Sequence, residues 1–156
     1  MAILVEVTAL YDADPDVVFA SALQFEEMQK AMKGLAVYDG IPANTAVKEG
    51  DTYTVDVTMF GWMKTKNHVI HTEKLDMKER VLQSREHNPS VKRWDHNLSV
   101  VEENGMACWR DCVVIDAGLN TWPTALFASF VYQHRHRYRN AIEITSTRRK
   151  LRDPLE

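Results

Sequence analysis

Residues 121–149 read TWPTALFASFVYQHRHRYRNAIEITSTRR and form the longest stretch of the chain with helical periodicity. Thr121 can cap the start and Pro123 falls in the first turn, so the stretch predicts one helix of about seven turns over residues 122–149. At about 100° per residue, one apolar arc forms, made of Phe127, Phe130, Val131, Tyr138, Ala141, Ile142 and Thr145. His134 falls inside this arc, and the opposite side holds Arg135, His136, Arg139 and Glu143. The helix is therefore expected to turn His134 inward and its charged side toward water.

Chain length, composition and net charge limit the classes of protein to which this sequence can belong. The chain has 156 residues, of which 45% are hydrophobic, which predicts a single domain over residues 1–156 with a core of its own. A net charge of −3 gives no overall basic field of the kind that nucleic-acid-binding domains use. One end of the chain is locally basic, through Arg135, Arg137, Arg139, Arg148, Arg149, Lys150 and Arg152. We interpret these charges as a solvated helix face, with a docking surface for a partner protein as the alternative.

The two cysteines and the N-terminus indicate the compartment. Cys108 and Cys112 lie four residues apart in a predicted strand, roughly 13 Å from each other and beyond the reach of a disulfide, which favours a reducing compartment. The opening MAILVEVTAL has no positively charged start, and no stretch approaches the ~18 apolar residues that a membrane span needs. We expect a soluble, cytoplasmic protein without a membrane span.

The rest of the chain predicts a first strand, a helical segment and a series of strands. Residues 3–11 are rich in β-formers, and Asp14 with Pro15 can open either one helix to residue 33 or two short ones with a bend. Strands are then predicted over residues 35–38, 52–59, 63–74 and 81–87. In the second of these, one face holds Tyr53, Val55, Val57 and Met59. The alternation does not decide which face of residues 63–74 points inward.

A hairpin follows, with strands over residues 92–102 and 106–116. If Asn104-Gly105 forms the type I′ turn that this dipeptide favours, Glu103 pairs with Met106. This register places the following residues on one apolar face: Trp94, His96, Leu98 and Val100 from the first strand, and Ala107, Trp109, Asp111, Val113 and Ile115 from the second. His96 then lies diagonal to Asp111, close enough for the side chains to meet. A histidine and a carboxylate are therefore expected to pair within the core face.

Strands in succession followed by one long helix indicate an α+β fold, with the helix packed across an antiparallel sheet. The segments VTALYDADPDVVFA, RWDHNLSVV, RDCVVIDAG and FVYQHRHRYRN resemble the START-type helix-grip superfamily (SRPBCC), which includes the birch-pollen allergen and polyketide cyclases. Trp94-x-His96 with Asp111 is similar to a pattern in a bacterial subgroup described as ligand-binding. The resemblance implies a curved sheet of about seven strands wrapped around the long C-terminal helix, with a cavity between them. Members bind lipids, hormones or polyketides, and some catalyse cyclisation, dehydration or hydrolysis.

The predicted inner faces of the helix and the sheet define one candidate interior. Its members are Tyr53, Val55, Val57, Met59, Trp94, His96, Leu98, Trp109, Asp111, Phe127, Phe130, His134 and Tyr138. A mostly apolar lining with a few polar groups is typical of a small-molecule pocket and equally of a filled core. As a pocket, it would bind a small hydrophobic or amphipathic ligand, such as a lipid, a polyketide or an aromatic molecule.

The polar members leave a second function open. In a cyclase or dehydratase acting on an enolisable substrate, His96 oriented by Asp111 would abstract a proton, and Tyr138 or His134 would donate to the oxyanion. The plainer alternative is that His96 and Asp111 are a buried pair that fixes the sheet. The close histidine pairs, His68 with His71 and His134 with His136, diverge in their predicted elements. We therefore expect no metal ion and no cofactor.

Overall fold

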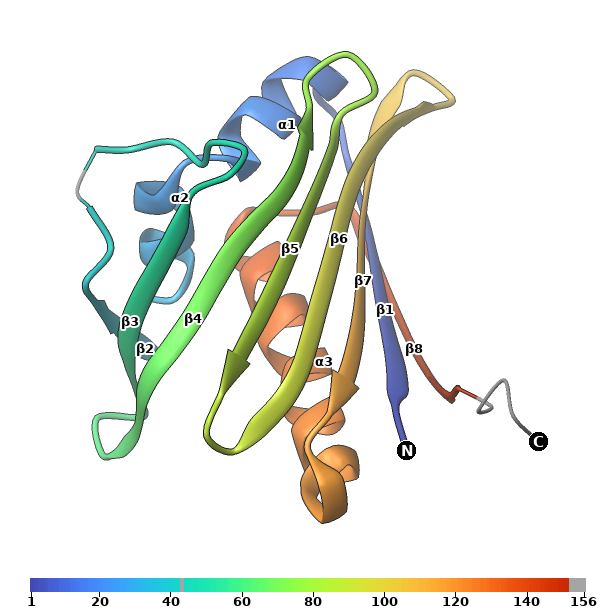
Figure 1. The fold of residues 1–156 in the computed structure, drawn as a ribbon. Coiled ribbons are helices and arrows are strands. Elements are labelled where there is room, and N and C mark those ends of the chain that lie inside the picture. Colours follow the sequence, from blue (N-terminus) through green and yellow to red (C-terminus); the bar gives the residue numbers. More distant parts are fainter. Residues whose placement is uncertain (43, 152–156) are drawn as a thin grey trace.

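The computed structural model describes residues 1–42 and 44–151, and within them a curved antiparallel sheet wraps around one long helix (Figure 1). Eight strands lie in the order β2-β3-β4-β5-β6-β7-β1-β8, one more than the seven predicted. The strands are β1 (Ile3–Tyr11), β2 (Ala36–Asp39), β3 (Thr52–Met59), β4 (Met63–Asp76), β5 (Val81–Asn88), β6 (Val91–Glu103), β7 (Met106–Asp116) and β8 (Glu143–Lys150). The helices are α1 (Pro15–Ala22), α2 (Phe25–Ala31), a 3₁₀ turn (Gly118–Asn120) and α3 (Thr121–Tyr138). The predicted α+β helix-grip class is confirmed.

The β6–β7 hairpin has the predicted register. Asn104 and Gly105 both adopt positive φ, 52° and 80°, as a type I′ turn requires, and Glu103 pairs with Met106. His96 consequently lies opposite Val113. Because this turn sets the faces of both strands, the apolar face predicted for the hairpin is the face that packs inward.

The segment after β1 forms two short helices and not one. Asp14 caps α1 by accepting hydrogen bonds from the backbone N–H groups of Asp16 and Val17. Gln24 is extended, with φ −86° and ψ 119°, and forms an isolated β-bridge with Ala46, so the helix cannot continue through it. The bend places α2 beside α3 and next to β2.

The closing helix is shorter than predicted. α3 has 18 residues and ends at Tyr138. Asn140 then adopts a left-handed conformation, with φ 57°. The backbone N–H of Ala141 donates to the carbonyl of His136 at 3.1 Å and that of Asn140 to Arg137 at 3.0 Å, the pair of bonds that defines a Schellman motif. Thr121 also does not cap α3, because its hydroxyl joins Ala117 to Gly118 in the preceding 3₁₀ turn.

Residues predicted to be the end of the helix form β8, which pairs antiparallel with β1. This stretch contains Ile142, Ile144, Thr145 and Thr147, β-branched residues that favour a strand over a helix. β8 also covers the edge of β1, which would otherwise expose unpaired backbone groups. The basic residues Arg148, Arg149 and Lys150 thus lie on a strand, and Arg152 lies outside the described residues.

The face of α3 that packs on the sheet matches the predicted arc only in part, since Val131 and Phe127 of the arc face the interior. The buried residues are Thr121, Ala125, Ala128, Ser129, Val131, Tyr132 and His136, while Trp122, Leu126, Phe130 and Tyr138, four or eight residues apart, form an exposed ridge. Small side chains let the helix approach the sheet closely, so Phe130 and Tyr138 face outward while Phe127 and Tyr132 face the interior. His136 is only 1% exposed, which corrects its predicted position toward water, and His134 is half-buried beside Phe130.

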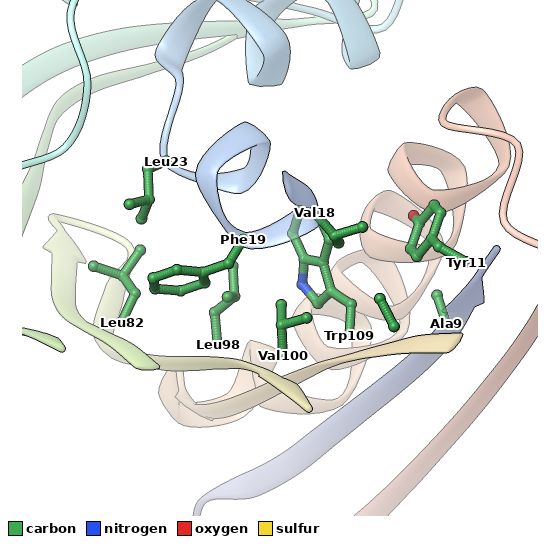
Figure 2. Packing of buried hydrophobic residues seen from close by; sticks show 10 residues of the cluster. Ala9, Tyr11, Val18, Phe19, Leu23, Leu82, Leu98, Val100 and Trp109 are labelled. Carbon is green, nitrogen blue, oxygen red and sulfur yellow. The ribbon is translucent and has the colours of Figure 1, made fainter. Parts of the chain in front are cut away.

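Three clusters of buried hydrophobic residues form the core of the described residues, and one of them, between α2, β2, β3 and α3, contains Met32, Leu35, Ala36, Met59 and Val131. Figure 2 shows α1 directing Val18 and Phe19 onto the inner face, where a second cluster also contains Leu98, Val100 and Trp109. The third cluster joins β1 and β7 to α3. Both cysteines are free thiols, and no helix in the described part of the chain is long and apolar enough to cross a membrane. The core side chains leave a cavity on the inner face of β3 to β6.

Candidate functional site

A cavity of about 500 Å³ lies between the inner face of β3–β6, α2 and α3. Most of its wall is apolar, with Phe25, Met28, Met32, Val57, Met59, Ile70, Leu82, Leu98, Phe127 and Val131 among the lining residues. The polar lining residues include Tyr38, His68, Ser84, Glu86, Asn88, His96, Tyr132 and Arg135. A cavity of this volume, largely apolar with a few polar groups, has the ordinary size and character of a small-molecule pocket.

The cavity includes about half of the lining predicted from the sequence. Val57, Met59, Trp94, His96, Leu98 and Phe127 all contribute to its wall. Val55 is buried elsewhere, and Tyr53 packs edge-on against Phe25 while its hydroxyl donates to Asp51. The predicted alternation of β3 holds, because Tyr53, Val55, Val57 and Met59 are all at least half-buried, so Tyr53 and Val55 share the predicted face without reaching the cavity wall.

Other predicted members are also absent from the cavity wall. Phe130 and Tyr138 are 44% and 52% exposed, and neither they nor the half-buried His134 belong to the cavity wall, which leaves Tyr138 and His134 outside the place predicted for an oxyanion donor. Trp109 is buried against Tyr11 and His136. Asp111 lies behind the wall, where it contacts the cavity only through His96.

The predicted pair of His96 and Asp111 is part of a longer chain of hydrogen bonds. His96 Nε2 lies 2.7 Å from Asp111 Oδ1, and His136 Nε2 lies 2.9 Å from Asp111 Oδ2. On its far side, His136 Nδ1 lies 2.7 Å from the hydroxyl of Tyr11. Four elements, β6, β7, α3 and β1, therefore meet at one buried carboxylate.

With Asp111 ionised and both histidines neutral, only one assignment of donors and acceptors satisfies all three hydrogen bonds of this network. Both Nε2–H groups donate to the carboxylate, and the Tyr11 hydroxyl donates to Nδ1 of His136. Burial alone would raise the pKa of Asp111, but the hydrogen bonds from His136 and His96 hold it well below its usual range. Burial raises the pKa of the Tyr11 phenol, so this group remains a donor.

One ring nitrogen of this hydrogen-bond network, Nδ1 of His96, remains available to a ligand. His96 lines the cavity, and within the described residues its Nδ1 has no hydrogen-bond partner. In the neutral tautomer fixed by Asp111, Nδ1 carries a lone pair and can accept a proton or a hydrogen bond. Tyr132 lies beside it, with the ring centroids 5.2 Å apart, and limits the direction from which a ligand can approach.

A second polar group lies across the sheet, on β4 and β5. His68 Nε2 donates to Glu86 Oε2 at 3.0 Å, and the Ser84 hydroxyl donates to Glu86 Oε1 at 2.8 Å. Asn88 contacts the other ring nitrogen of His68 at 3.2 Å. Burial would raise the pKa of Glu86, but His68 and the nearby His96 lower it below its usual value. The carboxylate is thus ionised, with both oxygens engaged.

Sequence reasoning missed His68, Ser84, Glu86 and His136 as members of the site. The inward face of β4 holds His68, Ile70 and Thr72, which answers the question that alternation left open. Polar residues at alternate positions, Ser84-x-Glu86-x-Asn88, were the available signal for an inward polar row on β5. Within the described residues, no cluster of three or more His, Cys, Asp or Glu side chains has the geometry to hold a metal ion.

A curved sheet around one helix, with a cavity between them, defines the START-type helix-grip (SRPBCC) fold, and the resemblance predicted from the sequence is confirmed at that level. Ara h 8.0201 is similar at 9% identity over 88% of this chain and 97% of its own, with a TM-score of 0.63. TTHA0849 from Thermus thermophilus is similar at 11% identity over 86% and 95%, with a TM-score of 0.63. Ms6760 from Mycobacterium smegmatis is similar at 10% identity over 86% and 86%, with a TM-score of 0.67. The sequence matches no protein-family model and no curated protein.

Proposed function

We propose that this protein binds a small amphipathic molecule in the cavity between the sheet and α3. The observation that carries the proposal is the cavity itself, about 500 Å³ of space with an apolar wall and a few polar groups that point inward. The helix-grip fold adds support, because the superfamily that it resembles commonly binds hydrophobic ligands. The apolar wall would bury the body of the ligand, and His96 with its neighbours would orient the polar end.

Uncharged amphipaths such as 4-phenyl-1-butanol and 2-naphthol are expected to stabilise the protein by about 2.7 kcal/mol when present at 100 times their Kd. Thermal denaturation with each compound measures this as a rise in Tm. Ile70→Trp places a large side chain at a half-buried point of the wall and is expected to abolish the rise. Phe130→Trp is the matched control, because Phe130 is exposed and outside the cavity. An equal loss in both variants, or no rise with the native protein, would contradict the proposal.

A second candidate function is proton abstraction from an enolisable ligand, as in a cyclase or dehydratase. The observation that favours it is the free Nδ1 of His96 at the cavity, in an imidazole oriented by Asp111. Hydrogen–deuterium exchange at the α-carbon of phenylacetone, followed by NMR in D₂O, tests it. His96→Gln is expected to slow the exchange about 10²-fold or more, and His134→Gln to leave it unchanged. Exchange at the rate of buffer alone in the native protein would eliminate this function.

A further inference from the structure

The inner side of α3 carries a cation without an acceptor. Arg135 is half-buried and lines the cavity, and its guanidinium carbon lies 5.2 Å from the centre of the Tyr132 ring. In the described part of the chain, Arg135 makes no hydrogen bond and no salt bridge. A guanidinium has five N–H donors in a fixed fork, so its stacking on Tyr132 leaves that fork free for an acceptor in the cavity.

A second guanidinium lies one helical turn further along. Arg139 is stacked over Trp109 at 5.0 Å, and all three of its guanidinium nitrogens are buried without a hydrogen-bond partner within the described residues. Burial lowers the pKa of Arg139 to about 10, and the charge of Arg135 contributes to the lowering. Like charges four residues apart on a helix repel each other. The structure thus holds two unpaired cations side by side, an arrangement that an added negative charge would stabilise.

The protein's own carboxylates do not supply that charge. Glu86 lines the same cavity, but its two oxygens already accept hydrogen bonds from His68 and Ser84. Asp111 is occupied by His96 and His136. Neither Glu86 nor Asp111 therefore pairs with Arg135, and its guanidinium is open to an acceptor inside the cavity.

From these contacts we infer that the ligand of the cavity is an amphipathic monocarboxylate, whose carboxylate pairs with Arg135 while its apolar body lies against the β3–β6 wall. The inference rests on the proposed binding function and specifies its ligand class. A carboxylate matches the guanidinium fork with two parallel hydrogen bonds. A dianion such as a phosphate monoester fits less well, because Arg139 does not line the cavity and Lys64 of the wall is exposed to water, so the second charge would have no further buried cation among the described wall residues to pair with. His96 Nδ1 then lies where it can accept from a hydroxyl group elsewhere on the ligand.

Two probes that differ only in their polar end test the inference: 4-phenylbutanoate and 4-phenyl-1-butanol, each titrated into the native protein by calorimetry at pH 7. The carboxylate is expected to bind at least tenfold more tightly than the alcohol. Arg135→Gln is expected to remove this preference, so that the ratio of the two Kd values falls to about one, and Arg135→Lys to keep only part of it. Arg137→Gln is the matched control on the same helix, because Arg137 is exposed and donates to Gln133. Circular dichroism verifies that each variant is folded.

The outcomes separate this inference from the proposed function. Binding of the alcohol as tightly as the carboxylate, or an unchanged Kd for the carboxylate in Arg135→Gln, overturns the monocarboxylate and leaves cavity binding standing. Binding of neither probe overturns both. Equal losses in Arg135→Gln and Arg137→Gln would mean that the preference reflects the overall basic character of the helix, which also overturns the pairing with Arg135.

Discussion

Replacement of Asp111 by alanine is expected to lower the free energy of unfolding by about 3–5 kcal/mol at pH 7. Asp111 is 2% exposed, and its carboxylate accepts hydrogen bonds from both His96 and His136. Without it, His136 keeps a buried N–H with no acceptor, because its other nitrogen is bonded to Tyr11. Urea denaturation measures the loss.

Asp95→Ala is the control for this substitution. Asp95 lies on the outer face of β6, where it pairs with Arg93, and a surface ion pair contributes at most about 1 kcal/mol. Similar losses for Asp95→Ala and Asp111→Ala would mean that the buried carboxylate has no special role. Asp111→Asn is the conservative variant: it retains one acceptor oxygen but presents an N–H₂ group to the second histidine, so it is expected to lose less than the alanine variant.

The same carboxylate makes stability depend on pH in a defined direction. Hydrogen bonds from His96 and His136 hold the pKa of Asp111 in the folded protein below its value in the unfolded chain, about 3.9. A group with a lowered pKa contributes its full stabilisation above the unfolded value and loses it as pH falls below about 4. The difference in unfolding free energy between the native protein and Asp111→Asn is therefore expected to narrow from pH 7 to pH 3. A constant difference would mean that Asp111 is not ionised in the fold.

The hairpin was predictable in detail because one local signal determines it. Asn104-Gly105 selects the turn, the turn sets the register, and the register decides which residues share a face. The pairing of His96 with Asp111 followed from that register, 15 positions apart in the chain, and the structure has it at 2.7 Å. No tertiary information was needed, since both strands and their turn are contiguous in sequence.

The closing helix shows where periodicity is insufficient. An apolar arc identifies the side of a helix with the largest hydrophobic residues, and in α3 that side includes Phe130 and Tyr138, which are exposed. Close packing against a curved sheet favours Ala125 and Ala128 instead, and brings His136 inward to Asp111. The stop signal was nevertheless present in the sequence, as Asn140 followed by a run of β-branched residues.

The inward face of β4 could not be predicted, because bulges change the face of a strand without a clear signal in the sequence. The register shifts twice along β4, opposite Val55 and Val57 of β3 and again between Thr72 and Lys74, and β4 has the extra residue both times. Each shift moves the following side chains relative to their neighbours, so alternation counted from one end fails at the other. The contact of His68 with Glu86 depends on the spatial arrangement of two separate hairpins.

Trp109→Ala is expected to lower the free energy of unfolding by about 3–5 kcal/mol, the range for removal of a large buried aromatic side chain. Trp109 is 2% exposed and joins three parts of the molecule: it packs with Val18 of α1, contacts His136 of α3 with the rings 5.0 Å apart, and carries the Arg139 guanidinium over its face. Its removal would create a cavity. It would also take away the ring beneath the Arg139 guanidinium, which has no hydrogen-bond partner among the described residues.

Two further variants show which property of Trp109 is responsible for the lower free energy of unfolding. Trp109→Phe is expected to cost much less than Trp109→Ala, because the indole Nε1 is buried without a hydrogen-bond partner in the described part of the chain, and phenylalanine removes that unsatisfied donor while it keeps a ring beneath Arg139. Trp62→Ala should change stability by no more than about 0.5 kcal/mol, since Trp62 is 75% exposed. Urea denaturation of all three variants provides the comparison. If Trp109→Phe lowered the free energy of unfolding as much as Trp109→Ala, the ring that phenylalanine retains beneath Arg139 would contribute nothing, which would contradict the stabilisation assigned to that contact.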